Sequence, residues 1–178
     1  MFKIKIAESP AMEIYLFNDN LILKRYKPSY PDYDIIFETE VNNLRYLNSK
    51  NIDSIPKLLK VDNKNTIMYM SYCGERISHS NKPINWKSQL KKIINDLKSV
   101  NFYHNDVVYD NVCVKEGKVY LIDFNGGSIG RYNPKKHNTY AKIERNSEDI
   151  EIPSNTVKNI FIVLISVGVI GMLIEKLI

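Results

Sequence analysis

The chain has 178 residues, which is enough for one domain of ordinary size with a hydrophobic core of its own. Its net charge of +5 comes mostly from lysines scattered among Asn, Ile and Tyr. No dense basic stripe with interleaved aromatic residues appears, so no nucleic-acid partner is expected. Cys73 and Cys113 lack the spacing of metal ligands, and the first residues lack a secretory signal, which predicts reduced thiols in a cytoplasmic protein.

The first half of the chain is predicted to contain two pairs of strands. Residues 13–17 and 21–26 are apolar runs around an Asn-Asp-Asn turn, which indicates a hairpin. Residues 55–61 and 66–70 form a second pair of the same kind. Lys24 lies inside the second strand of the first hairpin. Taken alone, a lysine there is most simply interpreted as a solvent-facing residue of an edge strand.

Between the two pairs of strands, residues 32–48 are predicted to form a helix. Phe37, Val41 and Leu44 recur on one face of it. Glu38 and Glu40 are the two glutamates of this segment, and either could face an interior cation.

A second helix is predicted from Trp86 onward, because apolar residues recur at helical spacing between lysines. These apolar positions are Trp86, Leu90, Ile93, Ile94 and Leu97. The helix leads directly into the most informative stretch of the sequence.

That stretch, residues 103–127, carries polar residues at fixed separations. Asp106 follows His104 by two positions, and Asn111 follows Asp106 by five. Asp123 comes at the end of a later apolar run.

A tight hairpin is predicted between these polar residues, with strands at 112–114 and 119–122. A hairpin brings its two ends together, so we expect Asp106, Asn111 and Asp123 to share one site. Carboxylate and carboxamide oxygens are hard donors of the kind that Mg²⁺ prefers. Asn111 and Asp123 are therefore candidate metal ligands, and Asp106 is the candidate to orient a hydroxyl group and accept its proton.

This pattern, His104-x-Asp106 with Asn111 and the later Asp123-Phe124, resembles the catalytic and metal-binding loops of the protein-kinase-like superfamily. It looks most like the small atypical members, namely the RIO-like, lipopolysaccharide-kinase-like and aminoglycoside-phosphotransferase-like families. The resemblance implies an α+β fold with two lobes and the use of ATP and Mg²⁺. It also implies that His104 braces the loop by hydrogen bonding and takes no part in the chemistry.

The resemblance also implies which residues contact the phosphates. Lys24 would neutralise the α- and β-phosphates and would join Asp106 and Asn111 among the catalytic residues. The family's spacing favours Glu40 over Glu38 as the ionic partner of this lysine.

The segment that joins the lobes would bind adenine. By position, the backbone of Ser71, Tyr72 and Cys73 would hydrogen-bond to the base, with Met70 at the back of the pocket. Backbone recognition leaves little trace in a sequence, so this assignment rests on position.

Two features that bear on phosphate binding depart from the family's pattern, besides Asn125, which stands where the family has a glycine after Asp123-Phe124. Residues 7–13 contain no glycine where the family has a glycine-rich loop over the phosphates, so Ser9 and free backbone amides would have to cradle them. Val108 stands where some members carry a lysine, which would leave charge neutralisation to Lys24 and the metal.

The composition of the sequence changes at two points after residue 130. Residues 131–157 are polar and irregular and are expected to be a linker or an activation-like segment. Residues 160–174 contain no charge and are apolar all round. Such a stretch is either a membrane anchor, with the catalytic part in the cytosol, or a buried helix of the second lobe, and the sequence leaves both open.

The expected architecture is a minimal two-lobed kinase-like fold. Residues 1–72 would form the first lobe and residues 73–130 a reduced helical second lobe, and a hydrophobic helix would occupy residues 158–178. The expected activity is transfer of the ATP γ-phosphoryl group to a hydroxyl acceptor, with protein serine or threonine ahead of a small molecule. The alternative is an inactive pseudokinase that binds nucleotide or serves as a scaffold, which the missing glycines and Val108 favour.

Overall fold

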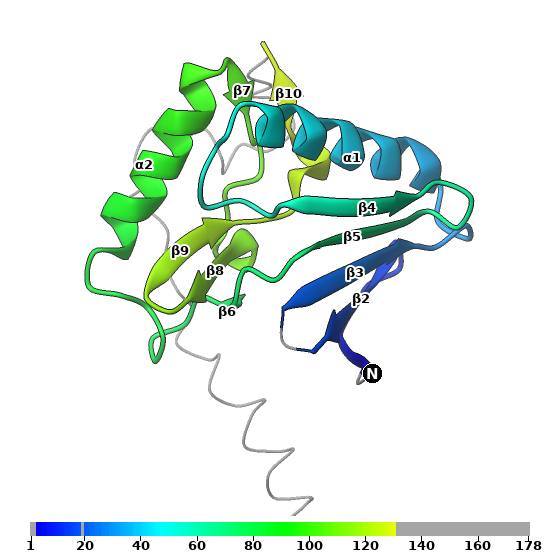
Figure 1. Cartoon of the computed structure of the whole chain (residues 1–178), viewed down its shortest axis with the longest axis horizontal. Helices are drawn as coiled ribbons and strands as arrows, with labels where there is room; N and C mark the ends of the chain where they lie inside the picture. The colour runs from blue at the N-terminus through cyan, green and yellow to red at the C-terminus, as the bar shows by residue number, and fades with distance from the viewer. Residues whose placement is uncertain (1–2, 19, 131–178) are drawn as a thin grey trace, which may run out of the picture.

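The computed structural model describes residues 3–18 and 20–130. Over these residues the chain forms two parts (Figure 1). The first contains a five-stranded sheet and helix α1, and the second contains helix α2 and several short strands. The mixed α and β architecture expected from the sequence is confirmed.

The first part is an antiparallel sheet in the order β1-β2-β3-β5-β4. The hairpin at residues 13–17 and 21–26 and the helix at 32–48 are confirmed. The strand expected at 55–61 begins later, because Pro56 has no amide hydrogen for the ladder. The elements are β1 (Lys3–Glu8), β2 (Met12–Phe17), β3 (Leu21–Tyr26), α1 (Tyr33–Ser49), β4 (Leu58–Asp62) and β5 (Ile67–Ser71).

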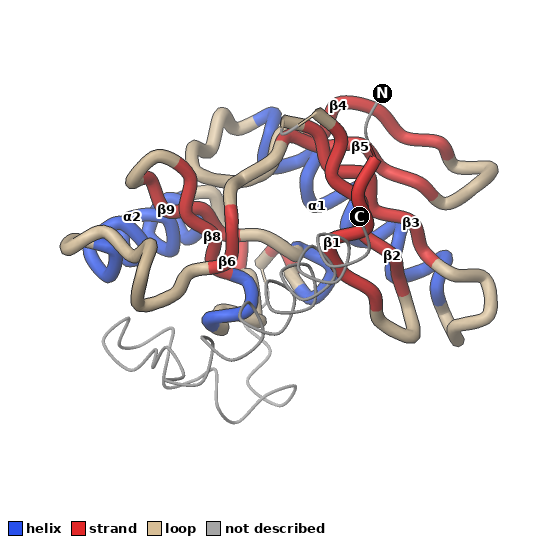
Figure 2. Tube along the Cα trace, turned by 90° about the horizontal axis from the view of Figure 1, so that it is seen from below, coloured by secondary structure: helices blue, strands red, loops and turns tan. Residues whose placement is uncertain are grey.

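The second part places α2 against a small sheet of order β6-β8-β9, and the two lie together at one end of the molecule (Figure 2). The Gln89 side chain of α2 accepts a hydrogen bond from Val119 N–H (2.9 Å) and donates one to Gly117 O (3.1 Å). Its elements are β6 (Glu75–Arg76), α2 (Trp86–Ser99), β7 (Phe102–Tyr103), the 3₁₀ turn η1 (Tyr109–Asn111), β8 (Val112–Lys115), β9 (Lys118–Leu121), the 3₁₀ turn η2 (Phe124–Gly126) and β10 (Ser128–Ile129).

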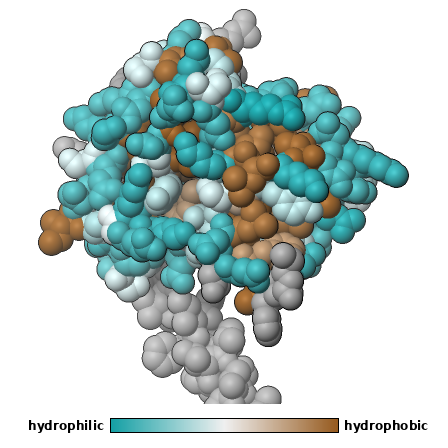
Figure 3. Space-filling model, in the orientation of Figure 1, coloured by the Kyte–Doolittle hydropathy of each residue, from teal (hydrophilic) through white to brown (hydrophobic). Residues whose placement is uncertain are grey.

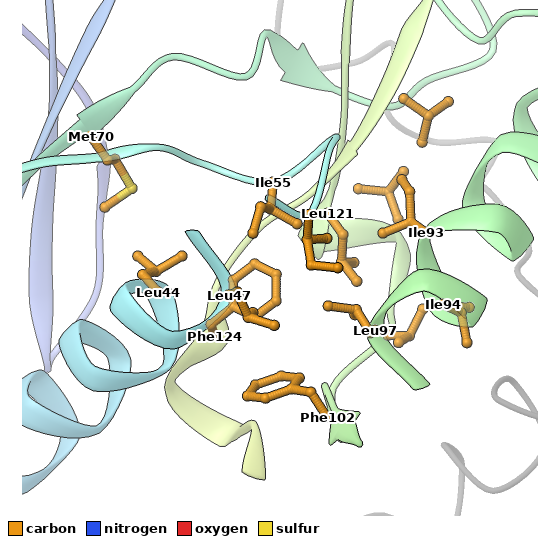
Figure 4. Packing of buried hydrophobic residues seen from close by; sticks show 14 of the residues in the cluster. Leu44, Leu47, Ile55, Met70, Ile93, Ile94, Leu97, Phe102, Leu121 and Phe124 are labelled. Atoms are coloured by element: carbon orange, nitrogen blue, oxygen red, sulfur yellow. The ribbon is translucent and has the colours of Figure 1, made fainter. Parts of the chain in front are cut away.

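A hydrophobic cluster runs through both parts. Leu44 and Leu47 of α1 lie beside Phe124, which immediately follows Asp123, and Phe102 and Leu97 extend the cluster to α2 (Figure 4). Burial of each such side chain contributes about 1.5–3 kcal/mol. This packing fixes the position of α1 relative to the loop that carries Asp123.

The visible surface is mainly hydrophilic, with hydrophobic side chains gathered near the centre, over the five-stranded sheet (Figure 3). No helix within residues 3–18 and 20–130 is long and apolar enough to cross a membrane. The segments predicted at residues 131–157 and 158–178 lie outside the described residues.

Candidate active site

Lys24 lies in a buried ionic cluster. Its Nζ atom is 2.7 Å from Glu40 Oε2 in α1 and 2.6 Å from Asp123 Oδ1. The hydroxyl of Tyr26, two residues along β3, also donates to Glu40 Oε2. Interpreting Lys24 as an exposed edge-strand residue is therefore wrong, because β3 is an inner strand and Lys24 is only 4% exposed. Glu38, the other candidate partner, is exposed.

Lys24 and the two carboxylates of this cluster shift one another's pKa values. Burial acts to lower the pKa of Lys24, but the carboxylates of Asp123 and Glu40 outweigh burial and hold that pKa well above its usual value. Burial acts to raise the pKa of Asp123, yet Lys24 lowers it. For Glu40, burial dominates and raises the pKa, with Lys24 acting against it. At neutral pH the Lys24–Asp123 pair is therefore ionic.

Asp106 and Asn111 are held together after β7. Asn111 Nδ2 donates to the main-chain oxygen of Asp106 (2.9 Å) and to Asp106 Oδ2 (3.0 Å). Asn111 O accepts a hydrogen bond from Ile122 N–H at 2.9 Å, which ties this loop to the residue before Asp123. Within the described part of the chain, the Oδ1 atoms of Asp106 and Asn111 have no hydrogen-bond partner and are free to accept one.

The loop that carries Asp123 lies next to Asp106. Asp123 has a left-handed backbone (φ 66°), and Asn125 Nδ2 donates to its Oδ1 atom at 2.9 Å. A Cβ atom built on Gly126 would lie 3.9 Å from Asp106 Cβ, so η2 and Asp106 are neighbours. The structure thus brings Lys24, Asp106 and Asp123 into one region, with Asn111 joining them.

His104 braces this region. Asp106 N–H donates to His104 Nδ1 (3.3 Å), so Nε2 carries the proton and donates to Ile122 O (2.9 Å). The ring packs edge-on against Phe124 at 4.7 Å. Burial lowers the pKa of His104, which keeps the imidazole neutral.

This buried neutral histidine predicts that acidification destabilises the protein. In the unfolded chain His104 would bind a proton near pH 6.5, whereas in the folded chain it does so only at lower pH. The contribution of neutral His104 to the free energy of unfolding is therefore fully present above pH 6.5 and is lost as the pH falls below it. Urea denaturation at pH 7.5 and 5.5 measures this loss. We expect a smaller loss in His104→Gln and an unchanged loss in the exposed control His79→Gln.

The predicted adenine-binding residues lie where the chain leaves β5. Met70 is buried, and the N–H groups of Ser71 and Tyr72 donate to Lys57 O and Asn20 O, both at 2.9 Å. Among residues 3–18 and 20–130, Cys73 N–H has no acceptor.

Gly74 then turns the chain away, and only glycine fits there. Its φ is +91°, and a Cβ atom would lie 2.0 Å from Val114 O. Burial raises the pKa of the neighbouring Cys73 thiol to about 12, so it stays protonated.

The turn between β1 and β2 is closed by its own hydrogen bonds. Ser9 N–H donates to Met12 O (2.9 Å), and Met12 N–H donates to Ser9 Oγ (3.2 Å). Pro10 has no N–H, so Ala11 N–H is the one amide of this turn without an acceptor among residues 3–18 and 20–130. Ser9 Oγ is the acceptor in the second of these bonds and its O–H can still donate to a phosphate, so the expectation that Ser9 and free backbone amides cradle the phosphates stays a prediction.

Oxygen donors are available at the predicted metal site. No three His, Cys, Asp or Glu side chains in the described residues are grouped as metal ligands. Asp123 Oδ2 and Asn111 Oδ1 are hard oxygen donors without another partner there. Mg²⁺ is usually held by one or two carboxylates together with water and substrate phosphates. The donor set therefore fits Mg²⁺ that enters with a nucleotide and does not fit a permanent all-protein site.

Three residues that sequence reasoning missed also hold the site together. They are Tyr26, which bonds Glu40, Asn43 of α1, which bonds the Asp123 loop, and Asn105, whose Nδ2 donates to Gly126 O at 3.1 Å. A polar residue on an otherwise apolar helix face was the only signal available, and it applies to Asn43 alone.

Known proteins resemble this chain in sequence and in fold. No family model matches the sequence. The chain is 31% identical over 112 residues to the KEOPS complex subunit Bud32 of Pyrococcus abyssi, covering 58% of this chain and 51% of that protein. The chain thus spans about half the length of this relative.

Solved aminoglycoside phosphotransferases share the fold. The streptomycin–ATP complex of APH(2'')-IIa matches with a TM-score of 0.51 and 15% identity, over 74% of this chain and 69% of that one. ADP-bound APH(2'')-Ib matches with a TM-score of 0.52 and 16% identity, over 73% and 67%. At these identities the likeness concerns the fold alone.

Proposed function

The chain is a member of the protein-kinase-like superfamily, and from that premise we propose that it transfers the γ-phosphoryl group of ATP to a hydroxyl acceptor. The observation that carries this proposal is the buried cluster of Lys24, Glu40 and Asp123, with Asp106 and Asn111 beside it. Phosphoryl transfer depends mainly on positioning and charge neutralisation, and this cluster offers both.

Each residue would have one task. The acceptor oxygen would form a bond to the γ-phosphorus while the bond from that phosphorus to the β–γ bridging oxygen breaks and ADP leaves. Asp106 Oδ1 would orient the acceptor hydroxyl and take its proton. Lys24, held by Glu40, would neutralise the α- and β-phosphates. Asn111 and Asp123 would hold Mg²⁺, which would neutralise charge on the phosphate oxygens.

The adenine would bind at the exit from β5. Cys73 N–H is a donor there that has no acceptor among the described residues, and Met70 closes the interior side. We propose protein serine or threonine as the acceptor class, with a small-molecule hydroxyl as the competing class.

Assays with γ-labelled ATP test the activity. Wild-type protein is expected to transfer label to a protein acceptor mixture or to an aminoglycoside, and removal of Mg²⁺ by EDTA should abolish the transfer. Mg-ATP should also raise the unfolding temperature, because a ligand at 100 times its Kd stabilises by about 2.7 kcal/mol. Absence of both effects would reject the proposal.

A pseudokinase is the second candidate, and the closed turn at residues 9–12 favours it. Within the described part of the chain, that turn offers the phosphates one amide without an acceptor, from Ala11, besides the Ser9 hydroxyl, and Val108 adds no charge. A Mg-ATP stabilisation without label transfer to any acceptor would establish this alternative.

The apolar stretch at residues 160–174 supports a further proposal, that these residues anchor the chain in a membrane, with a buried helix of the second lobe as the alternative. Carbonate extraction of membranes is expected to leave the protein in the pellet. Recovery of the whole protein in the soluble fraction would contradict the anchor.

A further inference from the structure

Asn43 occupies a position on α1 where an apolar residue is expected. It is 8% exposed and lies between Glu40 and Leu44 on the buried face of the helix. Asparagine is a poor helix former, and a buried carboxamide costs stability unless it is hydrogen-bonded. Its presence there calls for a specific partner.

The partner is the loop that carries Asp123. Asn43 Nδ2 donates to Phe124 O at 2.8 Å and to Gly127 O at 3.0 Å, so both of its hydrogens are used. These two carbonyls stand at the beginning and just beyond the end of η2. Glu40 Oε1, one turn earlier on α1, accepts a hydrogen bond from Phe124 N–H at 3.3 Å. Polar side chains of α1 therefore hydrogen-bond to both the N–H and the C=O group of Phe124 and to the C=O group of Gly127.

The remaining bonds of this loop do not reach α1. Asn105 Nδ2 donates to Gly126 O (3.1 Å) and to Ser128 Oγ (3.0 Å), which joins the loop to the Asp106 segment. Asn125 Nδ2 bonds Asp123 within the loop. Asn43 thus supplies the two shortest polar links between α1 and the loop.

We propose that Asn43 is a positioning residue that couples α1 to the Asp123 loop, so that Lys24, Glu40 and Asp123 are assembled before any nucleotide binds. The role of the assembled loop in holding Mg²⁺ rests on the proposed function. The coupling itself does not, because the hydrogen bonds that make it join protein groups alone. Asn43 contacts no reacting group and acts through the backbone of residues 124–127.

The test compares Asn43→Leu with Asn42→Leu in the full chain. Leucine matches asparagine closely in size but cannot donate, and Asn42 is the exposed neighbour on the same helix. Hydrogen exchange without nucleotide should be at least about tenfold faster for the Phe124 and Gly127 amides in Asn43→Leu. Loss of the two bonds to the loop carbonyls lets the loop open, and these amides then leave their acceptors, Glu40 Oε1 and Phe124 O. Exchange in α2 should not change. Asn42→Leu should match the wild type throughout.

A Mg²⁺ titration of the ATP-induced thermal shift gives the second measurement. Asn43→Leu should need about tenfold more Mg²⁺ for half of the maximal shift, whereas a purely structural defect would lower the unfolding temperature without changing the Mg²⁺ requirement. Asn43→Ala serves if the leucine variant does not fold. Unchanged exchange at residues 124–127 in a folded Asn43 variant would overturn the coupling. An unchanged Mg²⁺ requirement would also overturn the positioning role. A wild type that shows no Mg-ATP shift would instead reject the proposed function, while the exchange result would still decide the coupling.

Discussion

Replacing Asp106 with asparagine is expected to lower phosphate transfer by about 10²–10⁴-fold, the usual contribution of a positioned general base. Asparagine keeps the size of the side chain, and its amide can turn its oxygen toward Asn111 Nδ2, which now bonds Asp106 Oδ2 at 3.0 Å. The local fold should therefore persist. What is lost is the acceptor for the hydroxyl proton. Initial rates with γ-labelled ATP, measured at saturating Mg-ATP, give the size of the effect.

Asp110→Asn is the matched control for this substitution. Asp110 lies in the same loop, but its carboxylate is exposed and pairs with Arg76 at 2.8 Å. An exposed pair of this kind contributes about 0–1 kcal/mol, so the rate should stay within a fewfold of wild type. The Mg-ATP thermal shift should survive in both variants. Equal rates for wild type and Asp106→Asn would remove Asp106 from the mechanism.

Local periodicity explains which parts of the fold could be predicted. The apolar positions of α2 and the hairpin of β8 and β9 repeat at spacings that only one kind of element satisfies, and both were predicted correctly. Strand β1 has a readable alternation of Lys3, Ile4, Lys5 and Ile6, and it was overlooked. Strands β7 and β10 have two residues each, which is too short for any periodicity to show.

The candidate site depends on contacts that no local pattern encodes. Lys24 and Asp123 are far apart in the sequence, and only the resemblance to a kinase-like motif placed them together. From β3 alone, Lys24 looked like an exposed lysine, because a sequence does not reveal that β3 is an inner strand. Asn43 was missed for the same reason, since its partners are backbone carbonyls, which every residue carries.

Lys24→Met is expected to destabilise the fold by about 3–5 kcal/mol and to remove Mg-ATP binding. Methionine keeps the length of the side chain but leaves the carboxylates of Glu40 and Asp123 without their buried cation. Because domains are stable by only about 5–15 kcal/mol, this loss is a large share of the total. Urea denaturation at pH 7 measures it, and Lys60→Met on the exposed face of β4 should stay within about 0.5 kcal/mol of wild type.

The pH dependence of this loss separates the charge of Lys24 from the packing of its side chain. In the wild type, Lys24 keeps the pKa of Asp123 low, so the stability gained from the pair is present above the usual carboxyl pKa and disappears as the pH falls. Without the lysine, the buried carboxylate of Glu40 and the partly exposed carboxylate of Asp123 would be neighbours without a cation, and mild acid would relieve their repulsion by protonating one of them.

The difference between wild type and Lys24→Met should therefore shrink from pH 7 to pH 5. Adding Glu40→Gln should recover part of the lost stability without restoring ATP binding, because glutamine removes the repulsion but supplies no cation for the phosphates. A difference that stays constant with pH and in the double variant would mean that Lys24 stabilises the fold through its aliphatic chain and that its charge serves only the nucleotide.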